Sequence, residues 1–502
     1  MAVAHVRLRT GVHPVFRQAI VATALLATAI VLLWEAVASS DRPAQAVIWG
    51  GFALAAYATG LLCLVGARQG VGLGLALWRF GPWILVWYAL AYGLASTTWD
   101  QPQTGSTIAM INVSSVLRAL WLVAIGLTAW AVGYFAGPGR PAQRLVDNGV
   151  AVLGRRFGPE VRSPVTPWVL YAIGSAARLV SALTTGRFDY LGETASAVST
   201  ASGYQQILSV LTVCAPLALA AAALQVFRER IPMARVTLVV LLLVELSVSA
   251  ASGLKVNFLN AALAVIVAWS AARCRLPKSL VVLAIFVFLV IVIPFNSAYR
   301  STIHSGQRTL TSTQAIRAVP EVLRETVTGS SVGTALPKSF DYLFQRIQEI
   351  DNSAIILQKT PEQFGYLNPA QLVELPLSAF VPRAVWHGKP VYDSMYQVSQ
   401  EYYDQPSAVY TAAGITPVGD LYRYGGWITV VLGMFILGCG VRLLDNAMNI
   451  RENPHTVFLV LILFPTLVVA ESGWVAIFSG ILSTIFIWVL SVAIAFRPRA
   501  CA

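Results

Sequence analysis

The stretch LVVLAIFVFLVIVIPF, residues 280–295, decides the fold class of this chain because it contains no charged side chain. A second block, AIVATALLATAIVLLWEAVA at 19–38, reaches the roughly 20 residues that a helix needs to cross a bilayer. In lipid the backbone must satisfy its own hydrogen bonds, so these blocks form helices. The 502 residues are 57% hydrophobic and 12% charged, with a mean hydropathy of +0.68. The sequence therefore predicts an all-α polytopic membrane protein.

Apolar blocks recur along the chain and predict about twelve transmembrane helices. The predicted spans are 19–38, 45–66, 80–97, 118–136, 166–184, 205–227, 235–252, 256–272, 279–296, 426–444, 455–471 and 475–496. Arg and Lys gather at both termini and in every even-numbered loop, for example RERIPMAR at 228–235. By the positive-inside rule, both termini are expected on the cytoplasmic side of the membrane.

Three parts follow from this map: helices 1–9 with short loops (1–296), a large extracytoplasmic loop (297–425), and helices 10–12 with a cytoplasmic tail (426–502). The net charge of +12 comes mostly from the cytoplasmic loops, which face anionic lipid head groups, so no nucleic-acid partner is needed. The five cysteines form no Cys-x-x-Cys pair, and we expect neither a metal site nor a cofactor.

The large loop is expected to contain amphipathic helices and to form either a domain or a cap on the bundle. In PKSFDYLFQRIQEIDNSAIILQKTPEQF, 337–364, apolar residues recur at helical spacing. Arg346, Glu349 and Asp351 would lie on or near the polar side. They could form a solvated helix face or part of a site.

The stretch FVPRAVWHGKPVYDS, 380–394, concentrates Arg383, His387 and Lys389 around Trp386. The apolar residues 372–380 before it are too few to span and indicate an interfacial or re-entrant segment. Cations at the head-group plane suit a lipid-linked phosphate or pyrophosphate. Ordinary snorkelling toward phospholipid is the alternative. The loop is also rich in tyrosine, and Trp386, Tyr392 and Tyr422 are candidates for stacking on sugar rings.

Further polar groups stand at the predicted external ends of helices. SAASGLKVNFLN, 249–260, places Lys255 in a tight turn, and FNSAYRSTIHSGQR, 295–308, carries Arg300. In GITPVGDLYRYGGW, 414–427, Asp420 and Arg423 come just before a span that opens with two glycines. Ionisable groups near membrane depth are candidate functional residues. Asp420 could be a salt-bridge partner or the group that orients a reacting hydroxyl.

Three of these stretches resemble the Wzy-type oligosaccharide repeat-unit polymerases, which make O-antigens and exopolysaccharides. They are FVPRAVWHGKP (380–390) shortly after QRIQEID (345–351), TPVGDLYRYGGWITVVLGMFILG (416–438), and SGLKVNFL (252–259). The resemblance covers mainly residues 245–445. It implies a metal-independent, inverting glycosyltransferase with a GT-C-like bundle. Such an enzyme works on the outer face of the bacterial inner membrane. It transfers the growing glycan from undecaprenyl pyrophosphate to an incoming lipid-linked repeat unit.

The resemblance also implies that loop arginines hold pyrophosphate: Arg383 first, then Arg300 and Arg346. Lys389, Lys255 and Arg423 are further candidates from their positions. His387 and Asp420 are the candidates for a catalytic base, which contributes roughly 10²–10⁴-fold. The expected partners are the undecaprenyl-pyrophosphate-linked oligosaccharide, the lipid bilayer, and chain-length and export proteins.

Other functions stay open at this point. One is an O-antigen-ligase-like transfer to a different acceptor. Another is a flippase or transporter, which places ionisable residues within its spans; the candidates are Glu35, Arg178, Glu245 and Glu471. Primary active transport within this chain is excluded because no Gly-x-x-x-x-Gly-Lys-Ser/Thr loop is present.

Overall fold

The computed structural model describes residues 14–69, 78–99, 111–185, 205–303, 312–329, 332–378, 381, 386, 394–405, 413–450, 453–468 and 472–499. Nearly all of them are helical. In the first 300 residues the helices are α1 (Pro14–Ala38), α2 (Pro43–Gln69), α4 (Phe80–Tyr88), α5 (Val113–Ala136), α6 (Arg140–Arg156), α7 (Thr166–Thr185), α8 (Gln205–Thr212), α9 (Cys214–Leu224), α10 (Pro232–Ser252), α11 (Lys255–Arg273), α12 (Lys278–Val287) and α13 (Ile293–Ile303).

The remaining helices belong to the loop and the C-terminal part. They are α14 (Ser312–Gly329), α15 (Val332–Ile347), α16 (Ile350–Lys359), α17 (Gln371–Ser378), α18 (Ser394–Tyr403), α19 (Pro417–Ala447), α20 (His455–Leu467) and α21 (Trp474–Ala495). Turns of π- or 3₁₀-helix continue α4 as far as Thr98, extend α9, and join α12 to α13.

Within the described residues, nine helices are long and apolar enough to cross a membrane, which confirms the membrane-protein prediction. Three further predicted spans are helical but fall outside those nine. The span at 80–97 is broken into α-, π- and 3₁₀-helical turns, α7 is less apolar, and α20 is short. The predicted span at 279–296 continues as helix to Ile303, so Arg300 lies on a helix.

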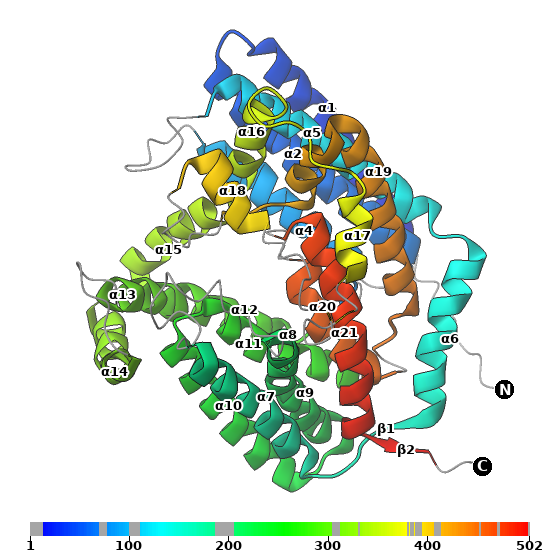
Figure 1. Cartoon of the computed structure of the whole chain (residues 1–502), viewed down its shortest axis with the longest axis vertical. Helices are drawn as coiled ribbons and strands as arrows, with labels where there is room; N and C mark the ends of the chain where they lie inside the picture. The colour runs from blue at the N-terminus through cyan, green and yellow to red at the C-terminus, as the bar shows by residue number, and fades with distance from the viewer. Residues whose placement is uncertain are drawn as a thin grey trace, which may run out of the picture.

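Figure 1 shows the helices in two groups. One group contains α1, α2, α5 and α19, and the other contains α7 to α12. Glycines set the helix spacing in the first group. A Cβ on Gly133 of α5 would lie 2.1 Å from the Phe435 carbonyl oxygen, and one on Gly438 of α19 would lie 2.1 Å from the Trp130 oxygen. Small residues allow such close backbone approach between membrane helices.

The helices of the long loop pack on this framework. α16 contacts α5 and α19, and α17 contacts α21. α15 contacts the turns that follow α4 as well as α13, and Figure 1 shows it running from the α13 side toward α16. We call the side of the molecule on which the helices of the long loop lie the loop side.

A short two-stranded sheet lies at the opposite side. β1 (Phe157–Val161) follows α6 directly and pairs antiparallel with β2 (Phe496–Pro498), with Val161 opposite Phe496. The His455 Nε2 atom lies 3.0 Å from the Gly158 carbonyl oxygen, and the Glu229 carboxylate accepts the Val161 N–H at 2.6 Å. The sheet therefore ties the end of the chain to its middle.

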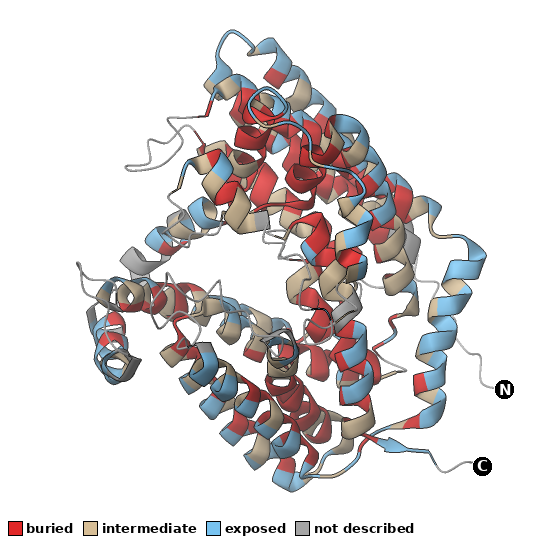
Figure 2. Ribbon diagram, in the orientation of Figure 1, coloured by how far each residue is buried: buried red, intermediate tan, exposed pale blue. Residues whose placement is uncertain are grey.

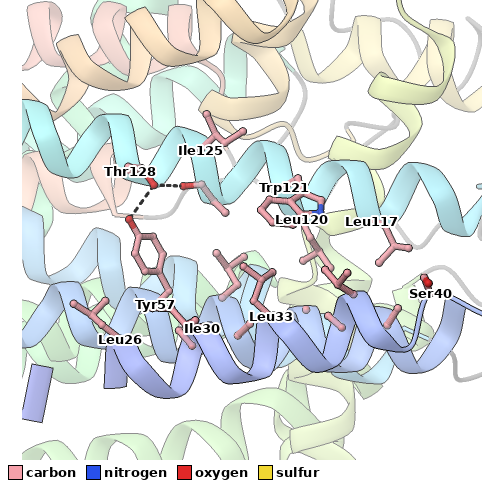
Figure 3. Close-up of a pocket in the computed structure, with 18 residues that line it drawn as sticks. Leu26, Ile30, Leu33, Ser40, Tyr57, Leu117, Leu120, Trp121, Ile125 and Thr128 are labelled. Atoms are coloured by element: carbon pink, nitrogen blue, oxygen red, sulfur yellow. Dashed lines mark hydrogen bonds between the residues drawn. The ribbon is translucent and has the colours of Figure 1, made fainter. Parts of the chain in front are cut away.

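A pocket of about 680 Å³ lies between α1, α2 and α5 (Figure 3). Its lining is almost entirely apolar, and among the described residues neither a carboxylate nor a cation contributes to it. The Tyr57 and Thr128 hydroxyls lie 2.9 Å apart and hydrogen-bond each other. Ile30 and Trp121 on its rim are exposed, so in a membrane this pocket faces lipid chains and offers no reacting group.

Candidate functional site

α19 begins with a short buried segment on the loop side. The Thr416 side chain accepts the Gly419 N–H at 3.4 Å and Pro417 occupies the first turn, both common at helix starts. The helix breaks at Gly425 and Gly426, and Gly426 adopts φ 64° and ψ −142°. The Thr429 hydroxyl bridges the break by donating to the carbonyls of Leu421 (2.7 Å) and Gly426 (2.9 Å). Residues 417–424 thus form a separate, buried helical segment of about two turns.

This segment carries a buried arginine between two carboxylates. Arg423 is 1% exposed, and its Nη1 lies 3.6 Å from Asp420 Oδ1, with Asp420 completely buried. Its Nη2 lies 3.5 Å from Glu401 Oε2 of α18, and the Glu401 side chain is 44% exposed. The guanidinium also lies 5.6 Å from the centroid of the Tyr402 ring. We call these four residues the Arg423 cluster.

The two carboxylates of this cluster differ in what they can do chemically. Asp420 is shielded from solvent and acts as a salt-bridge partner that holds Arg423. Glu401 is accessible, so it can meet a hydroxyl group of a ligand, as a general base must. Sequence reasoning missed Glu401, which reaches Arg423 only through the packing of α18.

Next to this cluster, α16 contributes buried polar groups. Glu349 is 1% exposed and accepts the Asn352 amide N–H at 2.9 Å, while the Tyr403 hydroxyl donates to Asn352 Oδ1 at 2.6 Å. The Asp351 carboxylate accepts the Trp99 indole N–H at 2.6 Å. Burial raises the pKa of Asp351 to about 6, and the Trp99 hydrogen bond opposes that rise.

The expectation that Glu349 lies on or near a polar helix side is wrong, because Glu349 is buried, whereas Asp351 is one of the partly exposed residues of α16. The chain turns at Gln348 and Glu349, where α15 ends and α16 begins. This turn directs Glu349 into the interior. The pattern of apolar residues did predict the two helices, but not the change in direction between them.

An aromatic group stands beside the break in α19. The Tyr422 ring is 6.3 Å from the rings of both Tyr366 and Trp427, with near-perpendicular planes. Tyr366 and Trp427 are exposed. Arg118 of α5 and Glu362 lie within electrostatic reach of the Tyr422 hydroxyl. Arg118 was also missed, because in the sequence it is simply the first residue of a predicted span.

A second polar cluster surrounds Gly253, which ends α10 in the left-handed conformation at φ 68°. The Gly253 carbonyl accepts N–H groups from Asn296 (2.6 Å) and from Arg300 Nε (3.2 Å) and Nη2 (3.1 Å). The Lys255 ammonium lies 4.8 Å from the centroid of the Tyr342 ring of α15. Arg346 follows Tyr342 by one helical turn and therefore shares its face. We call these residues the Gly253 cluster: Gly253, Lys255, Asn296, Arg300, Tyr342 and Arg346.

The predicted site residues thus fall into three sets. Asp420, Arg423 and Tyr422 lie in or beside the Arg423 cluster. Lys255, Arg300 and Arg346 are brought toward one another by α11, α13 and α15. Trp386 is exposed, whereas Arg383, His387, Lys389 and Tyr392 lie outside the described residues. That segment connects α17 to α18, which carries Glu401.

Charged residues inside the second helix group pair with each other. Both terminal nitrogens of Arg178 in α7 donate to Glu245 of α10, at 2.9 and 2.8 Å, and the Tyr171 hydroxyl donates to the same carboxylate at 3.1 Å. A bidentate pair with a third donor satisfies both charges. This pair therefore holds α7 against α10.

A family model described as Domain of unknown function (DUF8712) matches residues 178–450 of the chain, which is more than half of its length. The chain belongs to this DUF8712 family. No curated protein and no solved structure matches the chain.

The DUF8712 match begins at Arg178 and ends at Ile450, so it includes every residue of the Arg423 and Gly253 clusters. Arg118 of α5, which approaches Tyr422, and Trp99, which donates to Asp351, lie outside the match. Among the described residues, no group of three or more His, Cys, Asp or Glu side chains has a metal-binding arrangement.

Proposed function

We propose that this DUF8712 member is a glycosyltransferase of the inner membrane. In this proposal it transfers a growing glycan from a polyprenyl pyrophosphate to an incoming lipid-linked oligosaccharide, with its loop side outside the cytoplasm and both termini inside. One observation carries the proposal: a buried arginine at the start of a membrane helix separates a fully buried carboxylate from an accessible one.

The reaction needs a base near the acceptor and cations near the leaving group. Glu401 accepts the proton of the acceptor hydroxyl while that oxygen attacks the anomeric carbon of the donor sugar. The bond between this carbon and the pyrophosphate oxygen breaks, and the pyrophosphate leaves with the bonding electrons. Arg383 and Lys389, in the segment just before α18, neutralise the charge that develops.

Each remaining group has a supporting role in the proposal. Asp420 fixes Arg423, and Arg423 fixes Glu401 at the edge of the buried segment. The exposed rings of Tyr366 and Trp427, beside Tyr422, form a surface on which a sugar ring stacks. The Gly253 cluster brings three cations together from α11, α13 and α15 and holds the pyrophosphate of the second lipid substrate.

The test is an assay of the purified protein in liposomes with lipid-pyrophosphate oligosaccharide from the native host, with and without EDTA. We expect a ladder of products on a gel from the wild type in both conditions. Glu401→Gln should lower kcat by about 10²–10⁴-fold, because it removes the base. Arg300→Gln should mainly raise KM. Glu374→Gln, which alters another exposed carboxylate of the same loop, should leave both parameters within about twofold.

Two outcomes would favour the other functions. A single transfer to a different acceptor without a ladder would indicate a ligase. Movement of the lipid-linked sugar across the membrane without any transfer would indicate a flippase. Full activity in Glu401→Gln would remove Glu401 from the mechanism.

A further inference from the structure

α6 is an exposed helix on the side opposite the loop side, and the proposed reaction does not use it. It follows α5 after the Gly137 turn and leads directly into β1. Figure 1 shows it along the outer edge of the molecule, and in Figure 2 most of its residues are exposed. Its 17 residues form a rod of about 25 Å.

One face of α6 rests on the protein. Leu153 is its buried residue, and Gln143 accepts the Asn446 amide N–H of α19 at 3.0 Å. Near its end, a Cβ on Gly154 would lie 3.4 Å from the Asn453 side-chain oxygen. These contacts fix which face points away from the protein.

The outward side is basic. Arg140, Arg144, Arg155 and Arg156 are all exposed, and Asp147 is the acidic residue within the helix. The strand pairing adds further exposed arginines, because the Arg499 N–H donates to the Arg156 carbonyl at 2.9 Å and Arg497 is exposed beside it. Arg497 lies 3.5 Å from Glu160 in an exposed pair. The exposed arginines still outnumber Asp147 and Glu160, so the surface is strongly positive.

Beside the arginines runs an exposed apolar stripe. Leu145 is 76% exposed and Val152 is 51% exposed. They are seven residues apart, so they lie on the same helix face, with Gly149 between them and Ala142 one turn before Leu145. Arg144 and Arg155 lie together along one side of this face. A basic helix with a narrow apolar face is typical of helices that lie in the interface of a membrane.

We propose that α6, together with Arg497 and Arg499, binds the head groups of anionic phospholipids, with Leu145 and Val152 inserted among the upper acyl carbons. Charge complementarity favours phosphate groups, and the apolar stripe favours a lipid over a nucleic acid, which offers no apolar layer. α6 joins α5 to β1, so bound lipid holds the connection between the two helix groups. The proposal is independent of the proposed enzymatic function.

The test measures phosphatidylglycerol bound to the full-length protein, by native mass spectrometry and by the rise in unfolding temperature when this lipid is added to phosphatidylcholine nanodiscs. The variant R140Q/R144Q/R155Q/R156Q should lower the apparent affinity for phosphatidylglycerol by at least about tenfold. The matched control R230Q/R235Q/R273Q/K278Q removes four exposed cations at or near the ends of other helices and should keep most of the affinity.

A second variant, L145S/V152S, keeps every charge and should weaken lipid binding by severalfold. If the quadruple arginine variant does not fold, R144Q/R155Q and a salt titration of the wild type replace it, and the wild-type affinity should fall with added salt. Equal losses in the α6 variant and the control would overturn the proposal. So would an unchanged affinity in L145S/V152S, or wild-type binding of an acidic protein or RNA at α6 without a preference for phosphatidylglycerol.

Discussion

Gly426 is the residue that permits the break in α19, and with it the Arg423 cluster. Its backbone angles, φ 64° and ψ −142°, belong to a region that residues with a Cβ avoid. A Cβ there would also lie 2.9 Å from the Tyr366 hydroxyl. We expect Gly426→Ala to destabilise the protein by about 1–3 kcal/mol, measured as unfolding temperature in detergent.

Gly440→Ala is the matched control for this substitution. Gly440 belongs to the same helix, and a Cβ there meets nothing within 4 Å. Alanine should stabilise this helical position by up to about 1 kcal/mol. Equal effects of the two substitutions would contradict the role of Gly426 in the break.

Asp351 makes the stability of the folded chain depend on pH. Burial raises its pKa to about 6 in the folded protein, so the folded state holds this proton more tightly than the unfolded chain. With respect to this group, stability is highest below about pH 4 and declines as the pH rises to about 6, by roughly 3 kcal/mol. Asp351→Asn keeps an acceptor for the Trp99 indole and cannot ionise.

We therefore expect Asp351→Asn to match the wild type near pH 4 and to unfold at a higher temperature near pH 7. Thermal unfolding measured at several pH values checks this. A variant that is less stable than the wild type at pH 7 would show that the Asp351 charge is compensated in the folded protein.

At the scale of helices, Asp445 at the end of α19 fixes the start of α4. Its carboxylate accepts the backbone N–H groups of Phe80 (2.7 Å) and Gly81 (3.0 Å) and the Tyr134 hydroxyl of α5 (2.7 Å), and it is completely buried. Asp445→Ala leaves three buried donors without this acceptor, at a cost of about 1–3 kcal/mol each. Thermal unfolding should show that the free energy of unfolding falls by at least about 3 kcal/mol.

Asp147→Ala serves as the comparison for Asp445→Ala. Asp147 is an exposed carboxylate of α6 that accepts one hydrogen bond, from Gln143 at 2.7 Å. We expect a change within about 0.5 kcal/mol. A similar loss in both variants would mean that the Asp445 contacts contribute little to stability.

The helices were largely predictable from the sequence, whereas their mutual contacts were not. Hydropathy alone predicted every long apolar helix, because lipid leaves the backbone no other way to form hydrogen bonds. The Asp420–Arg423 pair could also be predicted from the sequence, since residues three apart meet on one helix. Glu401 comes from 22 residues away and Arg118 from another span, so only tertiary packing brings them to this helix.

At the scale of the whole molecule, the predicted orientation puts the loop side outside the cytoplasm. Cys274, in the exposed turn between α11 and α12, is a native reporter for the opposite side. With Cys501 replaced by alanine, a membrane-impermeant maleimide should label Cys274 only after the cells are permeabilised. Cys214 is buried and should stay unlabelled in the folded protein.

Gln363→Cys, in a Cys274→Ala background, reports on the loop side because Gln363 is exposed after α16. This cysteine should react in intact cells. The reverse pattern of labelling would invert the orientation and place the Arg423 cluster on the cytoplasmic side, which contradicts the proposed function.

The pairing of β1 with β2 also has a consequence for biosynthesis. Arg497 donates to the carbonyl of Arg162, and the two residues are 335 positions apart. At typical rates of translation, roughly 20 to 70 seconds pass between the synthesis of the two strands. During that time β1, which follows α6, has no partner strand, because β2 is not yet synthesised. Ribosome-bound chains that stop before Phe496 therefore lack this closure and leave the backbone groups of β1 without their partner strand.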